Sequence, residues 1–236
     1  KLVERLVANR SITRIAETTA LSPAQMQDRA IISPTSMGQP QVDAFREVRT
    51  RLLAASNDSN IVTLVAPVSR GSGGSYVARN LAAAFAFDDT KSAVLIDCDL
   101  YRPSQHTTMR INPFKGGLVN YLEDPATFIA DMLYETGIPR LRLVPAGAAP
   151  KRNSEYFSSF RMRLLVDSLR SRYPDRYLFM DSPPVLGAPD ARILADIADV
   201  VVLVAGYGRD SPDDVARAAA NFDPSKFAGV VFNEGV

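Results

Sequence analysis

The chain has 236 residues, of which 46% are hydrophobic and 22% charged, and its formal net charge is +1. This balance excludes a strongly basic surface of the kind that follows nucleic-acid phosphates, so we expect no nucleic-acid partner. The single cysteine, Cys98, excludes a disulfide framework, and no apolar run approaches the ~20 residues of a membrane helix, so we expect a cytoplasmic α/β protein.

The first 41 residues are predicted to precede the main domain. Apolar residues between 1 and about 20 are spaced as in a short amphipathic helix, which would pack on its own domain or dock on a partner. Residues 21–41 carry two Ser-Pro pairs, Gly38 and Pro40, which predict an extended linker. We therefore expect an N-terminal helix and linker over 1–41 and a domain over 42–236.

Residues 43–53 predict a helix with one apolar face. Four side chains would form that face: Phe45, Val48, Leu52 and Leu53. The arginines of this helix point elsewhere, which fits a solvated basic face or a subunit contact. The preceding linker and the spacing of Asp43, Arg46 and Arg49, three residues apart, favour a subunit contact as much as a solvated face.

A strand, a glycine-rich loop and a helix are predicted next, between residues 61 and 85. Residues 61–65 are apolar and mostly β-branched, residues 71–75 read Gly-Ser-Gly-Gly-Ser, and the following helix is rich in Ala and Leu. A loop of this kind at a helix N-terminus holds phosphate, because backbone N–H groups and the helix dipole attract the anion. We therefore expect a phosphate site here.

Gly74 stands where the usual phosphate loop has its lysine, which neutralises the β- and γ-phosphates. Losing one hydrogen bond to a charged group predicts a fall in ATP affinity of roughly 10- to 150-fold. Phosphoryl transfer should suffer more, because its transition state depends on neutralised charge. Arg70, just before the loop, and Arg79, a turn into the helix, are the candidates to replace that charge.

Acidic residues follow two further predicted strands. Asp97 and Asp99 come after the strand of residues 92–96, and Asp181 comes after the strand of residues 177–180. The carboxyl ends of parallel strands form the ligand-binding edge of an open α/β sheet. Unpaired acids are costly in a core but are good ligands for Mg²⁺ and its waters. This placement favours a metal or catalytic role over a structural one.

The remaining segments alternate between helices and strands. Predicted helices cover residues 118–122, 154–172, 190–196 and 212–221, and predicted strands cover residues 141–145, 200–205 and 227–232. In the long helix we expect five inward side chains: Phe157, Phe160, Leu164, Leu165 and Leu169. The alternation predicts a doubly wound, mainly parallel α/β sheet of the P-loop type with helices on both faces.

Several of these motifs together resemble those of a known family. Residues 43–52 are similar to its Glu-x-x-Arg-x-x-Arg assembly helix, with Asp43 in place of glutamate, and residues 94–103 and 178–186 are similar to its second Walker motif and Walker B region. Pro-Ala-Gly at 145–147 and Asn-Ser-Glu at 153–155 match a further connection. The chain thus resembles, from about residue 43 to 233, the bacterial protein-tyrosine autokinases (BY-kinases) of capsular and exopolysaccharide synthesis, relatives of MinD/ParA ATPases.

The resemblance implies specific roles. Asp97, Asp99 and Asp181 would be catalytic, with Asp97 assisting deprotonation of a tyrosine, and Ser75, Asp99 and Asp181 would hold Mg²⁺. ATP or ADP would bind at the loop residues Arg70, Gly71, Ser72, Gly73, Gly74, Ser75 and Tyr76. The helix with Asp43, Arg46 and Arg49 would mediate homo-oligomerisation.

The sequence also departs from the family pattern. Gly74 replaces the lysine, Tyr76 a small hydroxyl residue and Tyr101 an arginine, and a tyrosine-rich tail is missing, since the last tyrosine is Tyr207. These departures predict a degenerate member, a pseudokinase with weak or no ATP-dependent activity. It would act as a cytoplasmic regulatory or structural partner of a membrane polysaccharide co-polymerase, held at the inner membrane through that partner.

Three alternatives remain at this stage. An active Mg·ATP-dependent tyrosine autokinase or ATPase would use an arginine for the lysine. A positional ATPase of the MinD/ParA type is disfavoured, because the loop has a lysine at neither of that group's two positions and no amphipathic membrane helix follows the last strand. A Rossmann dinucleotide site is disfavoured because the third glycine is missing from its place.

Overall fold

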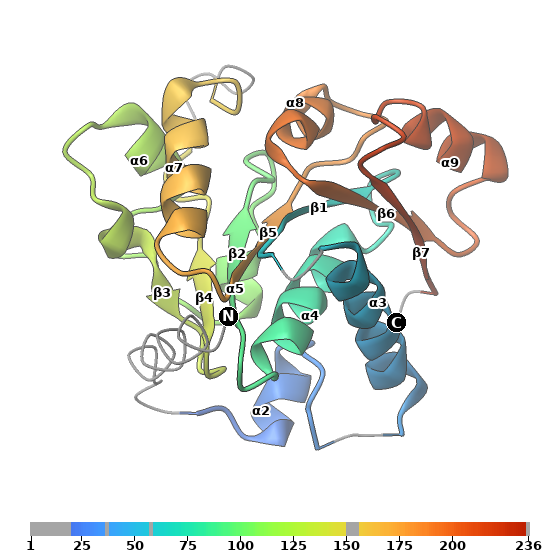
Figure 1. The fold of residues 1–236 in the computed structure, drawn as a ribbon, viewed down its shortest axis with the longest axis horizontal. Helices are drawn as coiled ribbons and strands as arrows, with labels where there is room; N and C mark the ends of the chain where they lie inside the picture. Colours follow the sequence, from blue (N-terminus) through green and yellow to red (C-terminus); the bar gives the residue numbers. More distant parts are fainter. Residues whose placement is uncertain (1–19, 36–37, 57–58, 150–155, 235–236) are drawn as a thin grey trace.

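The computed structural model describes residues 20–35, 38–56, 59–149 and 156–234, so the predicted helix at residues 1–20 lies almost wholly outside the described residues. Within these ranges the chain forms one seven-stranded sheet in the order β3-β4-β2-β5-β1-β6-β7 (Figure 1). The strands are β1 Val62–Pro67, β2 Ser92–Asp97, β3 Tyr134–Glu135, β4 Leu141–Val144, β5 Arg176–Asp181, β6 Val200–Gly206 and β7 Phe227–Asn233. All neighbouring strands pair in parallel except the short β3, which is antiparallel to β4.

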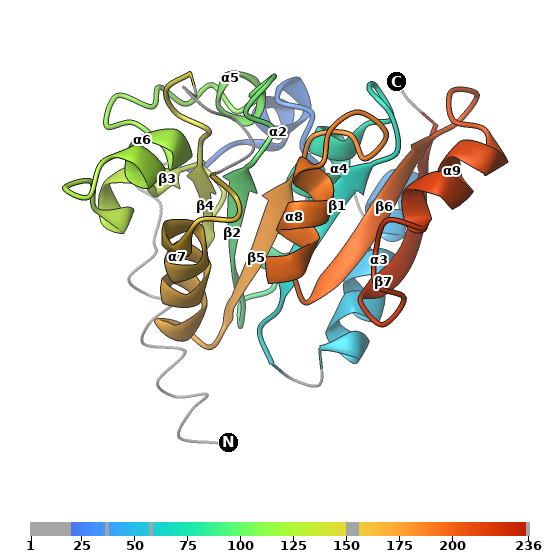
Figure 2. The same cartoon turned by 90° about the horizontal axis from the view of Figure 1, so that it is seen from above.

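Helices cover both faces of this sheet. One face carries α2 Pro23–Asp28, α3 Pro40–Ala55 and α4 Gly74–Ala86, and the other carries α6 Leu118–Glu123, α7 Phe160–Ser171, α8 Asp190–Ile197 and α9 Pro212–Ala219 (Figures 1 and 2). The short α5 Gln105–Thr108 follows β2, and a 3₁₀ turn, Ile129–Met132, precedes β3. The predicted doubly wound, mainly parallel fold is confirmed.

The central strands are buried on both faces, as their apolar runs predict. Every residue of β1, β2 and β5 is buried, so the side chains of each strand enter the cores above and below the sheet in turn. Burial of apolar surface stabilises a protein by about 25 cal/mol per Å², and here it acts on both faces of the sheet. The sheet is therefore a rigid base for the loops at its carboxyl edge. No helix among the described residues is long and apolar enough to cross a membrane.

The prediction of an extended linker over residues 21–41 is wrong for its first half. Pro23–Asp28 is helix α2, and its N-cap Ser22 forms a capping box with Gln25. The Ser-Pro pair that suggested a linker is instead a helix start, because proline fits the first helical position. Met26, Ile31 and Ile32 are buried in the core shared with α4, so this segment packs on the domain.

The inward face predicted for the helix at residues 154–172 is partly wrong. Helix α7 begins at residue 160, capped by Ser159, and the predicted start at residues 154–155 lies outside the described residues. Phe160 is 78% exposed and Leu164 43% exposed. The buried side chains are Met162, Leu165, Val166 and Leu169. These four residues follow the i, i+3, i+4, i+7 pattern of one helix face, whereas the prediction added large apolar residues outside that pattern.

Candidate functional site

The predicted phosphate loop lies between β1 and α4, at the carboxyl edge of the sheet. Gly71 and Gly73 have φ of +85° and +90°, in the left-handed region that favours glycine. Ser72 is buried, and its hydroxyl donates to the Asp210 carboxylate at 2.6 Å; the Ser69 hydroxyl donates to the same carboxylate. Asp210, in the β6–α9 connection, therefore holds the loop from behind.

Two further residues brace the loop, and the sequence analysis missed both. Asn233 Nδ2 donates to the Ser72 carbonyl at 3.2 Å, and a Cβ at Gly73 would lie 2.0 Å from that nitrogen. Arg209 Nη1 donates to the Arg70 carbonyl at 3.3 Å. These partners come from distant segments, so the local pattern of the loop carried no signal for them.

Gly74, the position of the missing lysine, is enclosed by a neighbour. A Cβ built on Gly74 would lie 2.7 Å from both Cγ and Cδ of Pro67, the last residue of β1. Real Cβ atoms do not approach other atoms so closely, and a proline ring on a buried strand has little freedom to move. Any side chain at position 74 therefore requires Pro67 or the loop to shift.

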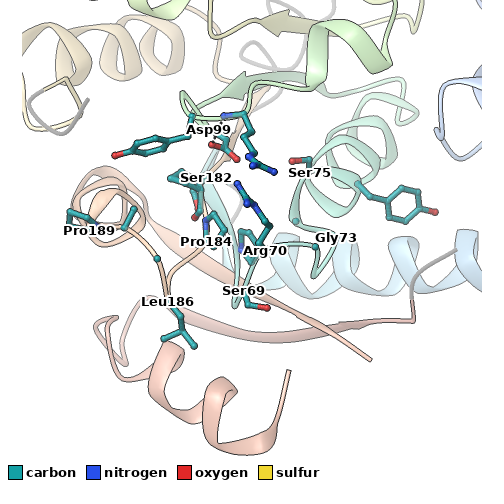
Figure 3. A pocket seen from close by; sticks show the side chains of 18 residues that line it. Ser69, Arg70, Gly73, Ser75, Asp99, Ser182, Pro184, Leu186 and Pro189 are labelled. Atoms are coloured by element: carbon teal, nitrogen blue, oxygen red, sulfur yellow. Dashed lines mark hydrogen bonds between the residues drawn. The ribbon is translucent and has the colours of Figure 1, made fainter. Parts of the chain in front are cut away.

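A pocket of about 580 Å³ opens in front of the loop (Figure 3). Seven of the predicted nucleotide and metal residues line it: Arg70, Gly71, Gly73, Gly74, Ser75, Tyr76 and Asp99. Proline and other apolar side chains form much of the opposite wall: Pro183, Pro184, Leu186 and Pro189. The lining does not include Ser72, Asp97 or Asp181, so the predicted set divides into residues that face the pocket and residues buried behind it.

The two buried acids lie side by side. Asp97 on β2 and Asp181 on β5 are register partners, and both are fully buried. Asp97 Oδ2 accepts the backbone N–H groups of Ser104 and Gln105, each at 3.1 Å. Asp181 Oδ2 accepts the Gln105 side-chain amide at 2.7 Å. Gln105, which the sequence analysis also missed, thus contacts both acids from the first position of α5, the short helix after β2.

Burial changes the ionisation of all three predicted catalytic acids. Desolvation, reinforced by the charge of Asp181, raises the pKa of Asp97 well above its usual range. Desolvation also raises the pKa of Asp181 to about 6, against the hydrogen bond from Gln105. The pKa of Asp99 is raised by desolvation as well, while the charges of Arg102 and Arg70 oppose the shift.

These acids suit a hard divalent cation. Asp97 Oδ1 and Asp181 Oδ1 are buried and accept no hydrogen bond from any described residue, which leaves oxygens of the type that Mg²⁺ prefers. Among the described residues, no three acidic, histidine or cysteine side chains gather closely enough to hold a metal by themselves. A cation here would complete its shell with the Ser75 hydroxyl, water and phosphate oxygens; the set Ser75, Asp99 and Asp181 stays a prediction.

The two arginines considered as substitutes for the lysine lie in different places. Arg70 rises from the loop into the pocket on the side of Asp99 (Figure 3), and its charge opposes the rise that burial causes in the pKa of that acid. Arg79 is only 4% exposed, is not part of the pocket lining and lies against the Gln105 side chain, with its guanidinium 6.0 Å from the centre of the Tyr76 ring. Of the two, only Arg70 is positioned to meet a phosphate in the pocket.

The helix predicted to mediate assembly is α3. Asp43 and Arg46 are half-exposed and form an ion pair at 3.6 Å within the helix. Arg49 Nη1 instead donates to the Ala84 carbonyl of α4 at 3.0 Å, so it already serves the fold of its own chain. The assembly role of the three residues stays a prediction.

At the far wall of the pocket, the aromatic residue that departs from the family pattern makes a defined contact. Tyr101 is half-exposed, and its hydroxyl donates to Asp190 Oδ2 at the start of α8, at 3.2 Å. An arginine at this position would present positive charge to the pocket, whereas tyrosine presents a ring held toward α8. The pocket thus has less positive charge than the family pattern implies at this wall.

Comparison with known proteins supports the resemblance seen in the motifs. No family model matches the chain. It is 28% identical over 192 residues to the tyrosine-protein kinase CpsD of Streptococcus agalactiae, covering 80% of this chain and 82% of CpsD. It is 31% identical over 212 residues to the tyrosine-protein kinase Wzc of Salmonella typhimurium, covering 89% of this chain but only 28% of Wzc.

A solved structure with the same overall arrangement is the BceF tyrosine kinase domain. It superposes with a TM-score of 0.74 at 28% sequence identity, and the match covers 92% of this chain and 91% of that domain. The structural similarity therefore extends over most of both chains.

Proposed function

We propose that this chain is a member of the bacterial tyrosine-kinase family of capsule and exopolysaccharide biosynthesis that includes CpsD and Wzc, and that it is a degenerate member with weak or no phosphoryl-transfer activity. It acts as a cytoplasmic regulatory or structural partner of a membrane polysaccharide co-polymerase. The chain spans about a quarter of Wzc, so the co-polymerase is proposed as a separate partner or as a further part of a longer protein.

The observation that carries this proposal is the contact between Gly74 and Pro67. The loop retains the left-handed glycines and the Ser75 hydroxyl, but Pro67 excludes any side chain from the position of the lysine. Asp97, the expected base for tyrosine, is fully buried behind the pocket. Both features weaken transfer, because they remove charge from the phosphates and distance the base from an incoming hydroxyl.

The test is a phosphorylation assay on the full chain with labelled Mg·ATP and an added tyrosine peptide as acceptor. We expect no phosphotyrosine above the level of the Asp97→Asn variant, which serves as the inactive reference. Phosphotyrosine that forms in the wild type and is abolished by Asp97→Asn would overturn the proposal.

One observation favours a second candidate, an active Mg·ATP-dependent tyrosine kinase or ATPase. Arg70 lines the pocket and acts on Asp99, so its guanidinium would contact the phosphates in place of the lysine. In that reaction the bond between the γ-phosphorus and ADP breaks, a bond to the tyrosine oxygen forms, and Asp97 takes the proton.

Substitution of Arg70 tests this candidate. Turnover that is lost in Arg70→Ala, largely kept in Arg70→Lys and unchanged in Arg192→Ala, an exposed arginine on α8, would support it. Equal turnover in Arg70→Ala and wild type would exclude Arg70 from the reaction.

A further inference from the structure

A buried arginine that does not line the pocket lies against the Gln105 side chain. Arg79 is on α4, one turn beyond Ser75, and is 4% exposed. Its Nη1 donates to Gln105 Oε1 at 3.0 Å and, more weakly, to the Ser75 carbonyl at 3.4 Å. Burying a guanidinium costs free energy unless it is well paired. We therefore asked what these contacts do for the site.

The contact with Gln105 decides how that side chain is oriented. Gln105 is fully buried, and its Nε2 donates to Asp181 Oδ2 at 2.7 Å and to the Ser75 carbonyl at 2.9 Å. Because Arg79 has only donors, it requires the oxygen end of the amide, which turns the nitrogen end to the acid. The reverse orientation would set oxygen against carboxylate and N–H against guanidinium, and both contacts repel.

The same arginine also touches the segment before the main domain. Arg79 Nε donates to the Ala30 carbonyl at 3.4 Å, and the neighbouring Asn80 donates to that carbonyl at 3.0 Å. Asn80 Oδ1 in turn accepts the backbone N–H of Ile32 at 2.7 Å. The side chains of Arg79 and Asn80 therefore hold residues 30–32 against α4.

We propose that Arg79 is a positioning residue, which fixes Gln105, and through it the carboxylate of Asp181 and the Ser75 turn, and which connects the segment at residues 20–35 to the nucleotide site. The identity of the ligand, a divalent cation with a nucleotide, rests on the proposed function; the positioning itself does not. Arg79 acts through its hydrogen bonds to Gln105 and Ser75, and its charge also favours the ionised form of the neighbouring Asp181.

The first experiment measures hydrogen exchange at single amides in the ligand-free protein. In Arg79→Leu we expect the Ser104 and Gln105 amides, which donate to Asp97, to exchange about tenfold faster, because one buried hydrogen bond of the Gln105 side chain is lost. Arg79→Lys, which keeps a donor toward Gln105, should recover part of the protection. Arg140→Leu is the matched control, since Arg140 donates to the Ala86 carbonyl at the other end of α4.

The second experiment measures Mn²⁺·ADP binding by calorimetry. We expect affinity to fall about tenfold in Arg79→Leu and in Gln105→Leu, with no further fall in the double variant, because both changes remove one connection. Additive losses in the double variant, or equal exchange in Arg79→Leu and Arg140→Leu, would overturn the proposal.

The two proposals fail in different ways. A wild type that binds no Mn²⁺·ADP contradicts nucleotide as the ligand, and the exchange comparison still decides whether Arg79 positions Gln105. Phosphotyrosine that depends on Asp97 contradicts the degenerate-kinase proposal. The role of Arg79 is then still decided by hydrogen exchange in Arg79→Leu against Arg140→Leu.

Discussion

The ring of Pro67 fills the space into which a side chain at position 74 would project, 2.7 Å from an ideal Cβ. The two positions are seven residues apart, on either side of the phosphate loop, and a side chain at position 74 clashes with the ring at position 67. Glycine at 74 is thus a consequence of proline at 67 as much as an independent loss of lysine.

Restoring the lysine should therefore require two substitutions. We expect Gly74→Lys alone to lower the free energy of unfolding by about 1–3 kcal/mol through overpacking, with no gain in Mg·ADP affinity. Pro67→Gly/Gly74→Lys should bind Mg·ADP roughly 10- to 150-fold more tightly than wild type, because the charged hydrogen bond is regained. Denaturant unfolding and calorimetry measure both effects, with Pro67→Gly as control; tight binding by Gly74→Lys alone would contradict the steric argument.

The buried Asp181 should make stability depend on pH. Its folded pKa of about 6 lies above the ordinary 3.8, so between these values the folded chain holds a proton that the unfolded chain releases. The cost of the charged form, on the order of 3 kcal/mol, is therefore fully present above pH ~6 and is relieved as the pH falls toward ~4. Unfolding free energies across this range should show a smaller dependence in Asp181→Asn than in wild type; parallel curves would contradict the prediction.

The brace behind the loop should be needed for anion binding. Asp210→Ala removes the acceptor for the Ser69 and Ser72 hydroxyls and for the Gly206 amide. We expect faster hydrogen exchange at residues 69–74 and about tenfold weaker Mg·ADP binding, because the loop amides lose their fixed direction. Asp213→Ala, an exposed acid on α9, is the control and should match wild type.

Two adjacent leucines on α7 should differ sharply in their effect on stability. Leu165 is fully buried and Leu164 is 43% exposed. Leu165→Ala should cost about 2–5 kcal/mol of unfolding free energy through the cavity it leaves, whereas Leu164→Ala should cost less than about 1 kcal/mol. Urea denaturation of both variants checks this, and similar losses would mean that α7 lies in a different register.

The arginines of α3 should separate assembly from folding. Arg46→Ala breaks only an exposed ion pair, so the unfolding free energy should change by less than about 0.5 kcal/mol. Arg49→Ala removes the donor to the Ala84 carbonyl and should cost about 1 kcal/mol. If α3 forms a subunit contact, the Arg46→Ala variant should have a lower sedimentation coefficient than wild type. Equal sedimentation coefficients of Arg46→Ala and wild type would contradict that contact.

The strands of the sheet and the loop and acids at its carboxyl edge could be predicted from the sequence, because both depend on local patterns. Apolar β-branched runs, the glycine loop and the acids at strand ends each follow from neighbouring residues, and the structure brings Ser75 and Asp99 to one pocket as expected. The Ser22-Pro23 pair was ambiguous, since a turn and a helix start share these residues.

The parts that could not be predicted depend on contacts between distant segments. The Pro67 ring against Gly74, the Gln105 amide between two acids, and the Asp210 and Asn233 contacts behind the loop arise only when separate strands and turns meet. Arg79 illustrates the same limit: its sequence position suggested a cation for the phosphates, but in the structure it contacts Gln105 and does not line the pocket.

The braces on the phosphate loop also constrain the order in which the molecule is built. Asn233 lies 161 residues beyond Ser72, and Asp210 lies 138 residues beyond it. Contacts of such long sequence separation form late, because a large part of the chain must first be ordered to bring them together. During synthesis, the loop at residues 68–73 therefore leaves the ribosome long before the residues that hold it exist, and it reaches its working shape only when β7 joins the sheet.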